Sequence, residues 1–327
     1  MAKTIGLFLA LAFLAAAVVP TAWAQAPADY PARPVRVVVP FAPGGLVDVT
    51  ARIVGQKMSD QLGKPFVVDN RTGAGGTIGT GIVARATGDG YTLLVVENSL
   101  AVLPSLYSRL PFDVIRDLTG VTQLLSAPMV LVIHPSLGAQ SFAEFVTVVR
   151  AHPGKFNYGS GGRGSSPHLG SEMLKAALNL DLAHVPYKGG AEALSALLGG
   201  QTQMQFVTPA LGVSHVRSGK LRAVLAATQG KRSPVLPDVI TAREAGLTDY
   251  AVENWFGILA PASTPKPIVA TLHAEAIKAL NAPELRERFV AQGSDVVGST
   301  PEQFTQFIRA EARRWSGAVK AAGIQPE

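Results

Sequence analysis

The regular alternation of short apolar runs, glycine-rich turns and amphipathic stretches constrains the fold of this chain most. Residues 35–39 read Val-Arg-Val-Val-Val, a β-branched run between prolines, and a glycine turn follows at 41–45. Residues 48–62 then carry apolar side chains at helical spacing, until Gly63 ends the pattern. A strand, a turn and a helix in this order form the unit of βαβ folds, in which helices cover a parallel sheet. The pattern therefore predicts an α/β protein.

The same unit recurs along the chain and indicates two similar domains. The segment 157–168 repeats the order of strand, glycine turn and helix start found at 37–48. A chain of this length is about twice the usual domain size, so two domains or one large α/β unit are expected. Further strands are predicted at 65–68, 91–96, 129–133, 156–159, 183–186, 204–208, 223–227 and 257–260, and further helices at 78–86, 141–151, 168–178, 191–198, 267–280 and 301–322.

The N-terminus has the pattern of a secretory signal peptide. Lys3 is the only charge before Asp29, residues 5–19 are apolar, and Ala22-Trp23-Ala24 places small residues on both sides of a cleavage site. A membrane-spanning helix needs roughly 20 apolar residues, which this run lacks. We therefore expect residues 1–24 to be removed and the mature chain to begin at Gln25, with an uncleaved N-terminal anchor as the alternative.

Composition and charge exclude several classes of function. The chain has no cysteine, so disulfides, a thiol nucleophile, a cysteine zinc site and an N-terminal lipid anchor are all excluded. The formal net charge is +6, but the basic residues are scattered and form no run with interleaved aromatic residues. Nucleic acid is therefore not expected as a partner. A diffuse positive field could collect anions, although a simple solubility charge explains it equally well.

Four glycine-rich turns each precede a predicted helix, at 43–46, 73–76, 159–165 and 188–190. Helix N-termini carry unpaired N–H groups and about half a positive charge. Glycine lets the backbone approach a ligand, and in α/β sheets such turns gather at the carboxyl ends of the strands. Together they predict an anion site that needs no Lys or Arg. The alternative is that each glycine only satisfies a tight turn.

Catalytic and cofactor motifs are missing from the sequence. There is no Walker A motif, no G-x-S-x-G elbow, and the glycines at 73–79 have one residue too many for a dinucleotide fingerprint. The six histidines lack metal-ligand spacing. Ser165 and His168 could form a hydrolase pair, but a serine at a helix start is more commonly a cap. No catalytic residue, metal or cofactor is expected.

Several longer motifs identify a family resemblance over the whole mature chain. The chain resembles the Bug-type periplasmic solute-binding receptors of the tripartite tricarboxylate transporter family. The matching motifs are Val-Val-Pro-Phe-Ala-Pro-Gly-Gly at 38–45 with Asp48, Asn-Arg-Thr-Gly-Ala-Gly-Gly at 70–76, Asp-Gly-Tyr-Thr-Leu at 89–93, Asn-Tyr-Gly-Ser-Gly-Gly-Arg-Gly-Ser at 157–165 with His168, His-Val-Pro-Tyr-Lys-Gly-Gly at 184–190, and Lys-Ala-Ala-Gly-Ile at 320–324.

The resemblance implies a two-domain Venus-flytrap fold, with a mostly parallel sheet in each domain. Domain 1 would comprise residues 30–125 plus 256–327, and domain 2 residues 126–255, with hinges near 123–127 and 254–258. Such a receptor is a periplasmic monomer that closes on a small organic acid and delivers it to membrane permease subunits. A secreted Ser/His hydrolase and a ligand sensor for a two-component system stay open as alternatives.

The expected ligand site combines the glycine turns with the motif positions of the family. One ligand carboxylate would be held largely by backbone groups of the first and third glycine turns. The expected site residues are Phe41, Pro43, Gly44, Gly45, Leu46, Asp48, Gly75, Gly76, Asn98, Ser99, Ser160, Gly161, Gly162, Arg163, Gly164, Ser165, His168, Tyr187, Val207 and Thr208.

Three departures from the family pattern bear on the ligand. Leu46-Val47 stands where the family commonly has Ser-Thr, and Val207 lies in a segment where an Asp is common. Arg163 often has a small polar counterpart. These changes favour an acid with an apolar or aromatic body, whose second carboxylate could meet Arg163. Alternatively, Leu46 and Val47 pack against their own domain and Arg163 is a solvated loop residue.

Overall fold

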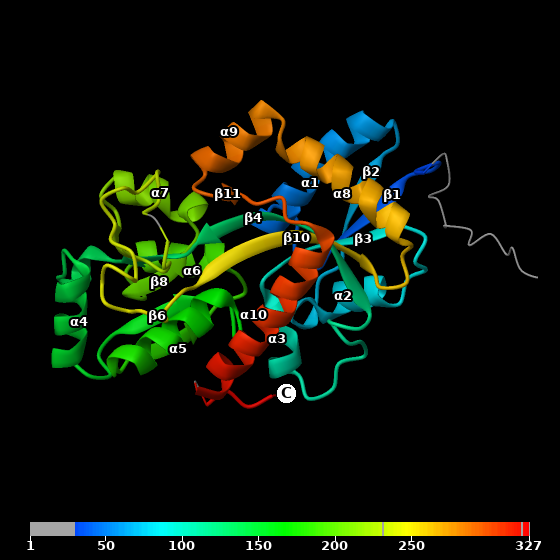
Figure 1. The fold of residues 1–327 in the computed structure, drawn as a ribbon. Helices are drawn as coiled ribbons and strands as arrows, with labels where there is room; N and C mark the ends of the chain where they lie inside the picture. The colour runs from blue at the N-terminus through cyan, green and yellow to red at the C-terminus, as the bar shows by residue number, and fades with distance from the viewer. Residues whose placement is uncertain (1–29, 231, 322, 327) are drawn as a thin grey trace, which may run out of the picture.

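The computed structural model describes residues 30–230, 232–321 and 323–326, so the expected signal peptide lies outside the described residues. Two α/β halves lie side by side, and the long strands β4 and β10 run from one half toward the other (Figure 1). Within the described residues, every helix is too short or too polar to cross a membrane.

The first half is built on a six-stranded sheet with the order β11-β4-β10-β3-β1-β2. β1 is parallel to both β2 and β3, whereas β10 is antiparallel to β3 and β4. The short strand β11 pairs antiparallel with β4 at the edge. The strands are β1 Val35–Val39, β2 Phe66–Asn70, β3 Thr92–Glu97, β4 Leu118–Pro128, β10 Glu253–Pro261 and β11 Asp295–Val296.

The second half is built on a five-stranded sheet with the order β7-β6-β8-β5-β9. β6 is parallel to β7 and β8, and β5 is antiparallel to β8 and β9. The strands are β5 Val130–Ile133, β6 Asn157–Ser160, β7 Ala183–Pro186, β8 Met204–Val207 and β9 Arg222–Ala226.

Both sheets are mixed, which corrects the expectation of mostly parallel sheets. The reason is the double crossing between the halves. β4 carries the chain out of the first sheet, β10 brings it back, and the two strands pair side by side in opposite directions. β5 enters the second sheet from β4 and runs against its neighbours. The parallel units β1–β3 and β6–β8 predicted from the alternation lie beside these crossing strands.

Helices cover both faces of each sheet. In the first half these are α1 Leu46–Leu62, α2 Thr77–Ala84 after the 3-10 turn η1 Ala74–Gly76, α3 Ser99–Leu106, α8 Lys266–Leu280, α9 Pro283–Ala291 and α10 Pro301–Ala321. In the second half they are α4 Phe142–Ala151 after the 3-10 turn η2 Pro135–Leu137, α5 Ser166–Leu178, α6 Gly190–Leu198 and α7 Pro209–Arg217.

Strand β1 shows how the sequence produces two buried faces. Val37 and Val39 pack with α1 and α8, and Val38 packs with Val83 of α2 on the opposite face. Side chains alternate along a strand, so the three consecutive valines at 37–39 fit a sheet covered on both sides.

One core cluster continues from the first half into the second. It joins Leu103 of α3 and Trp315 of α10 to Trp255 of β10, and extends to Leu131 and Phe206 of the second sheet. Helix α10 also contacts both α3 and α5 along this junction (Figure 1). The halves are therefore packed together on the side of the crossing strands.

The division into residues 30–125 plus 256–327 and 126–255 stays a proposal. The strands of the first sheet come from 35–128 and 253–296, and those of the second from 130–226. The expected hinge segments at 123–127 and 254–258 lie where β4 pairs with β10, and the register shifts between Phe256 and Gly257 and between Ile258 and Leu259.

Candidate anion-binding site

Six helices begin at the carboxyl ends of the parallel strands. In the first half α1, α2 and α3 follow β1, β2 and β3, and in the second half α5, α6 and α7 follow β6, β7 and β8. Neighbouring parallel strands end at the same edge of a sheet, so each group of three N-termini gathers at one edge. The Asn98 amide, after β3, donates a hydrogen bond to Ser166 Oγ at the start of α5. The two edges therefore meet at one junction.

Among the described residues, none of these six helices donates a first-turn backbone N–H to the side chain of its N-cap residue. The residues at these positions are Gly45, Gly76, Asn98, Ser165, Gly189 and Thr208. Outside the junction, α4 is capped, because Ser141 Oγ accepts a hydrogen bond from Glu144 N at 3.2 Å, whereas α8 and α9 also lack a side-chain cap within the described part of the chain. The N–H groups of Thr77, Ala101 and Leu211 donate to backbone carbonyls, and the other first-turn N–H groups at the junction have no side-chain cap from the residues that the structure describes, as an anion site requires.

Asp48 stabilises the first glycine turn, which contains Phe41, Pro43, Gly44 and Gly45. This carboxylate is 3% exposed and accepts hydrogen bonds from Gly44 N and from Asn70 Nδ2, both at 2.9 Å. Arg52 pairs with it at 3.0 Å. Burial alone would raise the pKa of Asp48, but the hydrogen bonds from Arg52, Gly44 and Asn70 outweigh it and lower the pKa. Asp48 therefore fixes the turn and is already occupied by three donors.

Leu46 and Val47 pack against their own half. Val47 is buried in the core between α1, α8 and the first sheet, and Leu46 packs against the same cluster. A residue enclosed in this core cannot line a ligand. Val47, and in part Leu46, therefore pack against their own domain, which was the alternative to a contact with the ligand.

The second glycine turn lies beside the first. Gly75 and Gly76 have φ of 62° and 96°, which L side chains rarely adopt. A Cβ on Gly76 would lie 3.6 Å from Cζ of Phe41, and one on Gly75 would lie 2.9 Å from the Tyr107 hydroxyl. Glycine at these positions lets the start of α2 approach the 41–45 turn closely.

Strand β3 ends at Glu97, and Asn98 and Ser99 follow it at the start of α3. The half-buried Glu97 accepts a hydrogen bond from Asn254 Nδ2 of β10 at 3.1 Å, and burial raises the pKa of its carboxyl. The buried Asn98 also donates to Glu253 O at 3.2 Å. Asn98 Oδ1 and Asn254 Oδ1 are buried acceptors without a partner among the described residues. The base of the junction thus offers acceptors that a ligand or a water could meet.

The third glycine turn connects β6 to α5. Ser160 is 0% exposed, and its Oγ lies 2.7 Å from His184 Nε2 and accepts a hydrogen bond from Gly162 N at 3.1 Å. A Cβ on Gly161 would lie 3.0 Å from Gly190 N, so only glycine lets this turn approach the start of α6. Ser160 therefore stabilises the turn from inside and is shielded from a bound ligand.

The geometry does not support a hydrolase built on Ser165 and His168. Ser165 Oγ donates to Gly162 O at 2.7 Å, and His168 Nδ1 accepts from Gly164 N at 2.9 Å. Each side chain is thus bonded to the backbone of the turn. A nucleophile and its base must instead be bonded to each other. His168 is buried, so it supports the turn from behind and does not face a ligand.

The remaining expected residues differ in where the structure places them. Val207 is 1% exposed and packs in the core of the second half, which corrects its expected ligand contact. Thr208 Oγ1 at the start of α7 is buried without a partner among the described residues. Tyr187 is half-buried beside Gly159. Arg163 is exposed and donates from Nη2 to Gln325 O at 3.1 Å, so this contact directs it to the C-terminal segment.

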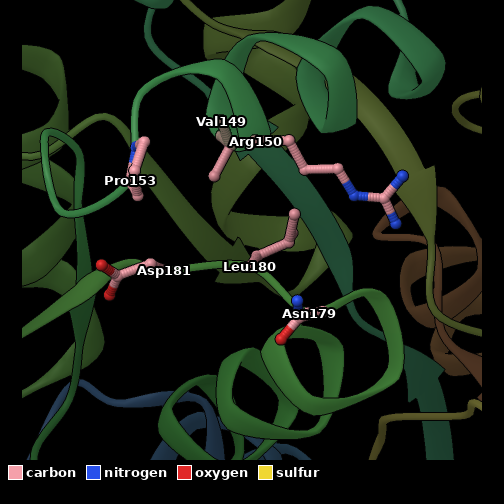
Figure 2. A pocket seen from close by; sticks show the side chains of 6 residues that line it. All are labelled: Val149, Arg150, Pro153, Asn179, Leu180 and Asp181. Atoms are coloured by element: carbon pink, nitrogen blue, oxygen red, sulfur yellow. The ribbon is translucent and has the colours of Figure 1, made fainter.

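A surface pocket lies elsewhere on the second half (Figure 2). It sits between the end of α4 and the turn after α5, next to the amino ends of β6 and β7. Its lining residues are Val149, Arg150, Pro153, Asn179, Leu180 and Asp181. This is the edge opposite the glycine turns, so the pocket is not part of the junction. The described residues also contain no cluster of His, Asp and Glu suited to a metal ion.

The family profile described as "Tripartite tricarboxylate transporter family receptor" matches residues 50–324 of this chain. The chain belongs to the tripartite tricarboxylate transporter receptor family. The expected resemblance is thereby confirmed, and the likeness to the solved periplasmic binding protein BugD, with a TM-score of 0.82 and 34% identity over 91% of this chain and 100% of that one, confirms the expected two-domain fold.

Individual relatives of the receptor family agree over nearly the whole chain. Protein BugT of Bordetella pertussis is 38% identical, over 98% of this chain and 97% of BugT. The solved structure of Rpa4515 from R. palustris with adipate is 31% identical, with a TM-score of 0.84, and covers 91% of this chain and 100% of that one. MatC from Rhodopseudomonas palustris, solved with bound malate, is 35% identical with a TM-score of 0.80, covering 89% and 100%.

Sequence reasoning missed three residues of the junction, namely Ser166, His184 and Asn254. His184 stands in a recognised motif but was not assigned a contact, because its neighbour Ser160 lies on another strand. Ser166 lies 68 residues from its partner Asn98, and Asn254 lies 157 residues from its partner Glu97. No local signal in the sequence marks such pairs.

Proposed function

We propose that this receptor captures a small organic mono- or dicarboxylate at the junction of its two halves, outside the cytoplasm, and delivers it to a tripartite tricarboxylate-type permease. The observation that carries the proposal is the group of six helix N-termini without side-chain caps at that junction. Two related proteins that were solved with carboxylates, Rpa4515 with adipate and MatC with malate, support it.

The strength of helix N-termini argues that the halves must enclose the ligand. One N-terminus contributes about 0.3–2 kcal/mol toward an anion. Micromolar binding needs about 8 kcal/mol, which even six N-termini do not supply at the exposed-site maximum of about 1 kcal/mol each. Burial of the ligand adds stronger hydrogen bonds and excludes water. We therefore propose a closing movement about β4 and β10, by a monomer.

The junction residues favour two kinds of ligand body. An apolar or aromatic body was inferred from Leu46, Val47 and Val207, of which Val47 and Val207 pack in cores. The unpartnered acceptors Asn98 Oδ1 and Asn254 Oδ1 instead favour a ligand or bridging waters that donate hydrogen bonds. Hydroxylated diacids are therefore proposed as ligands together with apolar ones.

A thermal-shift screen of the mature chain tests the proposal. A ligand that binds only the folded state raises the stability by about 2.7 kcal/mol at a hundred times its Kd. Adipate, malate, aromatic monoacids and acidic amino acids form the panel. We expect at least one acid without an ammonium group to raise Tm. No shift with any acid would contradict the proposal.

Export and delivery need separate tests. Intact-mass measurement of the exported protein is expected to give an N-terminus at Gln25, and a full-length membrane-bound product would contradict export by a cleaved signal.

A sensor of a two-component system could use the same closed state. Uptake of the identified acid by cells lacking the receptor separates the two, because loss of uptake supports delivery to a permease and unchanged uptake supports sensing.

A further inference from the structure

The third glycine turn rests on a stack of three rings. Tyr158 of β6, His184 of β7 and His168 of α5 lie nearly parallel behind it. The ring centroids of His168 and His184 are 4.1 Å apart with an interplanar angle of 20°, and those of Tyr158 and His184 are 4.9 Å apart at 16°. Three separate elements thus supply one supporting layer under residues 160–165.

Each histidine in the stack is bonded to the turn through a ring nitrogen. Gly164 N donates to His168 Nδ1 at 2.9 Å, so Nδ1 bears a lone pair and the neutral ring carries its proton on Nε2. His184 Nε2 lies 2.7 Å from Ser160 Oγ, which accepts from Gly162 N. Gly162 and Gly164 have φ of 114° and 77°. The two rings therefore fix the two glycines whose left-handed conformation shapes the turn.

Gly164 in turn is the contact between this turn and the other half. A Cβ added to Gly164 would lie 2.1 Å from Leu106 Cδ1 at the end of α3. Next to it, Ser166 at the start of α5 receives the hydrogen bond from Asn98. His168 therefore holds Gly164, which is the residue of the turn that contacts the other half.

Burial keeps the histidines of the stack neutral at neutral pH, and the charges around them modify its effect. Burial, with the neighbouring His184, lowers the pKa of His168 to about 4, and burial also lowers the pKa of His184. Glu172 opposes both shifts, whereas Lys175 and Arg163 add to them. Glu172 is itself bonded to the Tyr158 hydroxyl and, at 2.8 Å, to Lys175 Nζ.

We propose that His168 is a positioning residue for ligand binding, which holds Gly164 against α3 only as a neutral ring and releases the turn when it is protonated. This inference rests on the proposed carboxylate-binding function. A protonated ring has an N–H on Nδ1, which would face the N–H of Gly164, so the hydrogen bond would become a contact of two donors. Because the folded pKa lies below the unfolded value of about 6.5, the stabilisation is complete above that pH and is lost as the pH falls toward 4.

Three substitutions of His168 test the role of its acceptor. His168→Asn keeps an acceptor close to the position of Nδ1, whereas His168→Gln moves it outward and His168→Ala removes it. His152→Ala, at an exposed histidine of the same half, is the control. Amide hydrogen exchange of residues 162–165 is measured in the ligand-free mature protein, and calorimetry measures affinity for the acid found in the screen.

The expected results separate positioning from folding and from ligand identity. At pH 7.5 we expect His168→Ala to raise the amide exchange rate of residues 162–165 about tenfold and to lower the affinity for the acid about tenfold. Both effects follow from the loss of one hydrogen bond. His168→Asn and His152→Ala should stay within about twofold of the parent, while His168→Gln resembles Ala. After correction for intrinsic rates, exchange in the parent should rise between pH 7.5 and 4.5, and exchange in His168→Asn should not.

Two results would overturn the inference about His168. Exchange of the turn in His168→Ala equal to that of the parent would show that the ring does not hold Gly164. Equal impairment in His168→Asn and His168→Ala would show that ring packing, and not the acceptor, matters. If no acid binds the parent protein, the proposed function fails, but the exchange measurements still decide the role of His168.

Discussion

Asp48 is a buried carboxylate with three donors, so its charge should stabilise the folded state. Asp48→Asn would leave Gly44 N, Asn70 and Arg52 with a poorer acceptor. We expect the free energy of unfolding to fall by about 1–3 kcal/mol at pH 7, measured by urea denaturation. Because the pKa of Asp48 is lowered on folding, its contribution is present above the unfolded pKa of about 3.9 and is lost as the pH falls through the folded pKa.

Asp60→Asn provides the matched control for Asp48→Asn. Asp60 lies on the same helix, α1, but it is exposed and bonded only to Gln56 among the described residues. An exposed substitution of this kind changes stability by at most about 0.5 kcal/mol. A loss at Asp48 no larger than that at Asp60, or one that stays constant down to low pH, would contradict the account of Asp48.

Glu97 should show the opposite pH dependence. Burial raises the pKa of Glu97 on folding, and its carboxylate accepts a hydrogen bond from the neutral amide of Asn254. The stability it contributes is present below the unfolded pKa of about 4.3 and is lost as the pH rises through the folded pKa. We expect Glu97→Gln to raise Tm relative to the parent more at pH 8 than at pH 4.5.

The exposed Glu287 supplies the control for Glu97→Gln. Glu287→Gln should shift Tm equally at both pH values. A Glu97→Gln variant whose Tm difference from the parent does not grow between pH 4.5 and 8 would show that Glu97 is not stabilised in its neutral form.

Side-chain direction is the part of the site that the sequence could not provide. The motifs located the turns at 41–45, 73–76 and 160–165, and the structure brings them to one junction. Val207 and Arg163, however, stand in the right segments but face a core and the C-terminal segment respectively. Whether a residue beside a turn faces inward depends on packing between distant elements, and no local pattern records it.

At the scale of elements, the third glycine turn offers a test of how closely the halves must approach. Gly164→Ala adds a Cβ that would overlap Leu106 of α3, so Leu106 must move away. We expect weaker binding of the acid found in the screen, by about tenfold, measured by calorimetry. Backbone strain contributes as well, because φ at Gly164 is 77° and a left-handed L residue costs roughly 1–2 kcal/mol.

Gly138→Ala is the control that separates the backbone strain of an alanine at positive φ from the overlap with Leu106. Gly138 has φ of 82°, and an added Cβ would meet no atom within 4 Å. Both substitutions should lower Tm, but only Gly164→Ala should weaken ligand binding. Equal affinities in the two variants would show that the approach of α3 to the turn is not needed.

Periodicity predicted the parallel units of the fold but not the crossing strands. The strand predicted at 183–186 agrees with β7, and the helix predicted at 48–62 agrees with α1 to within two residues. Strand β4 and helices α3, α7 and α9 were not predicted. β4 mixes polar residues with apolar ones, and Pro104 interrupts α3, so neither matches a simple period. The antiparallel direction of β10 depends on the whole chain path, which periodicity does not contain.

At the scale of the whole molecule, ligand capture should make the receptor more compact. The two sheets are joined through β4 and β10, whose register shifts fall within the expected hinge. Small-angle scattering of the mature protein should give a smaller radius of gyration with a saturating acid than without it. If calorimetry confirms that a ligand binds but the radius of gyration stays unchanged, closure is contradicted, although binding itself is not.

The requirement for a carboxylate tests the central claim most directly. Calorimetry is done with the mature protein, the acid found in the screen, and the same molecule with its carboxylate converted to a carboxamide, one end at a time for a diacid. Helix N-termini favour the anion, so we predict that converting the carboxylate held at the junction weakens binding by at least about a hundredfold, which corresponds to about 2.7 kcal/mol. Equal affinity for the acid and for every carboxamide would contradict the account, because it would show that the six N-termini do not bind an anion.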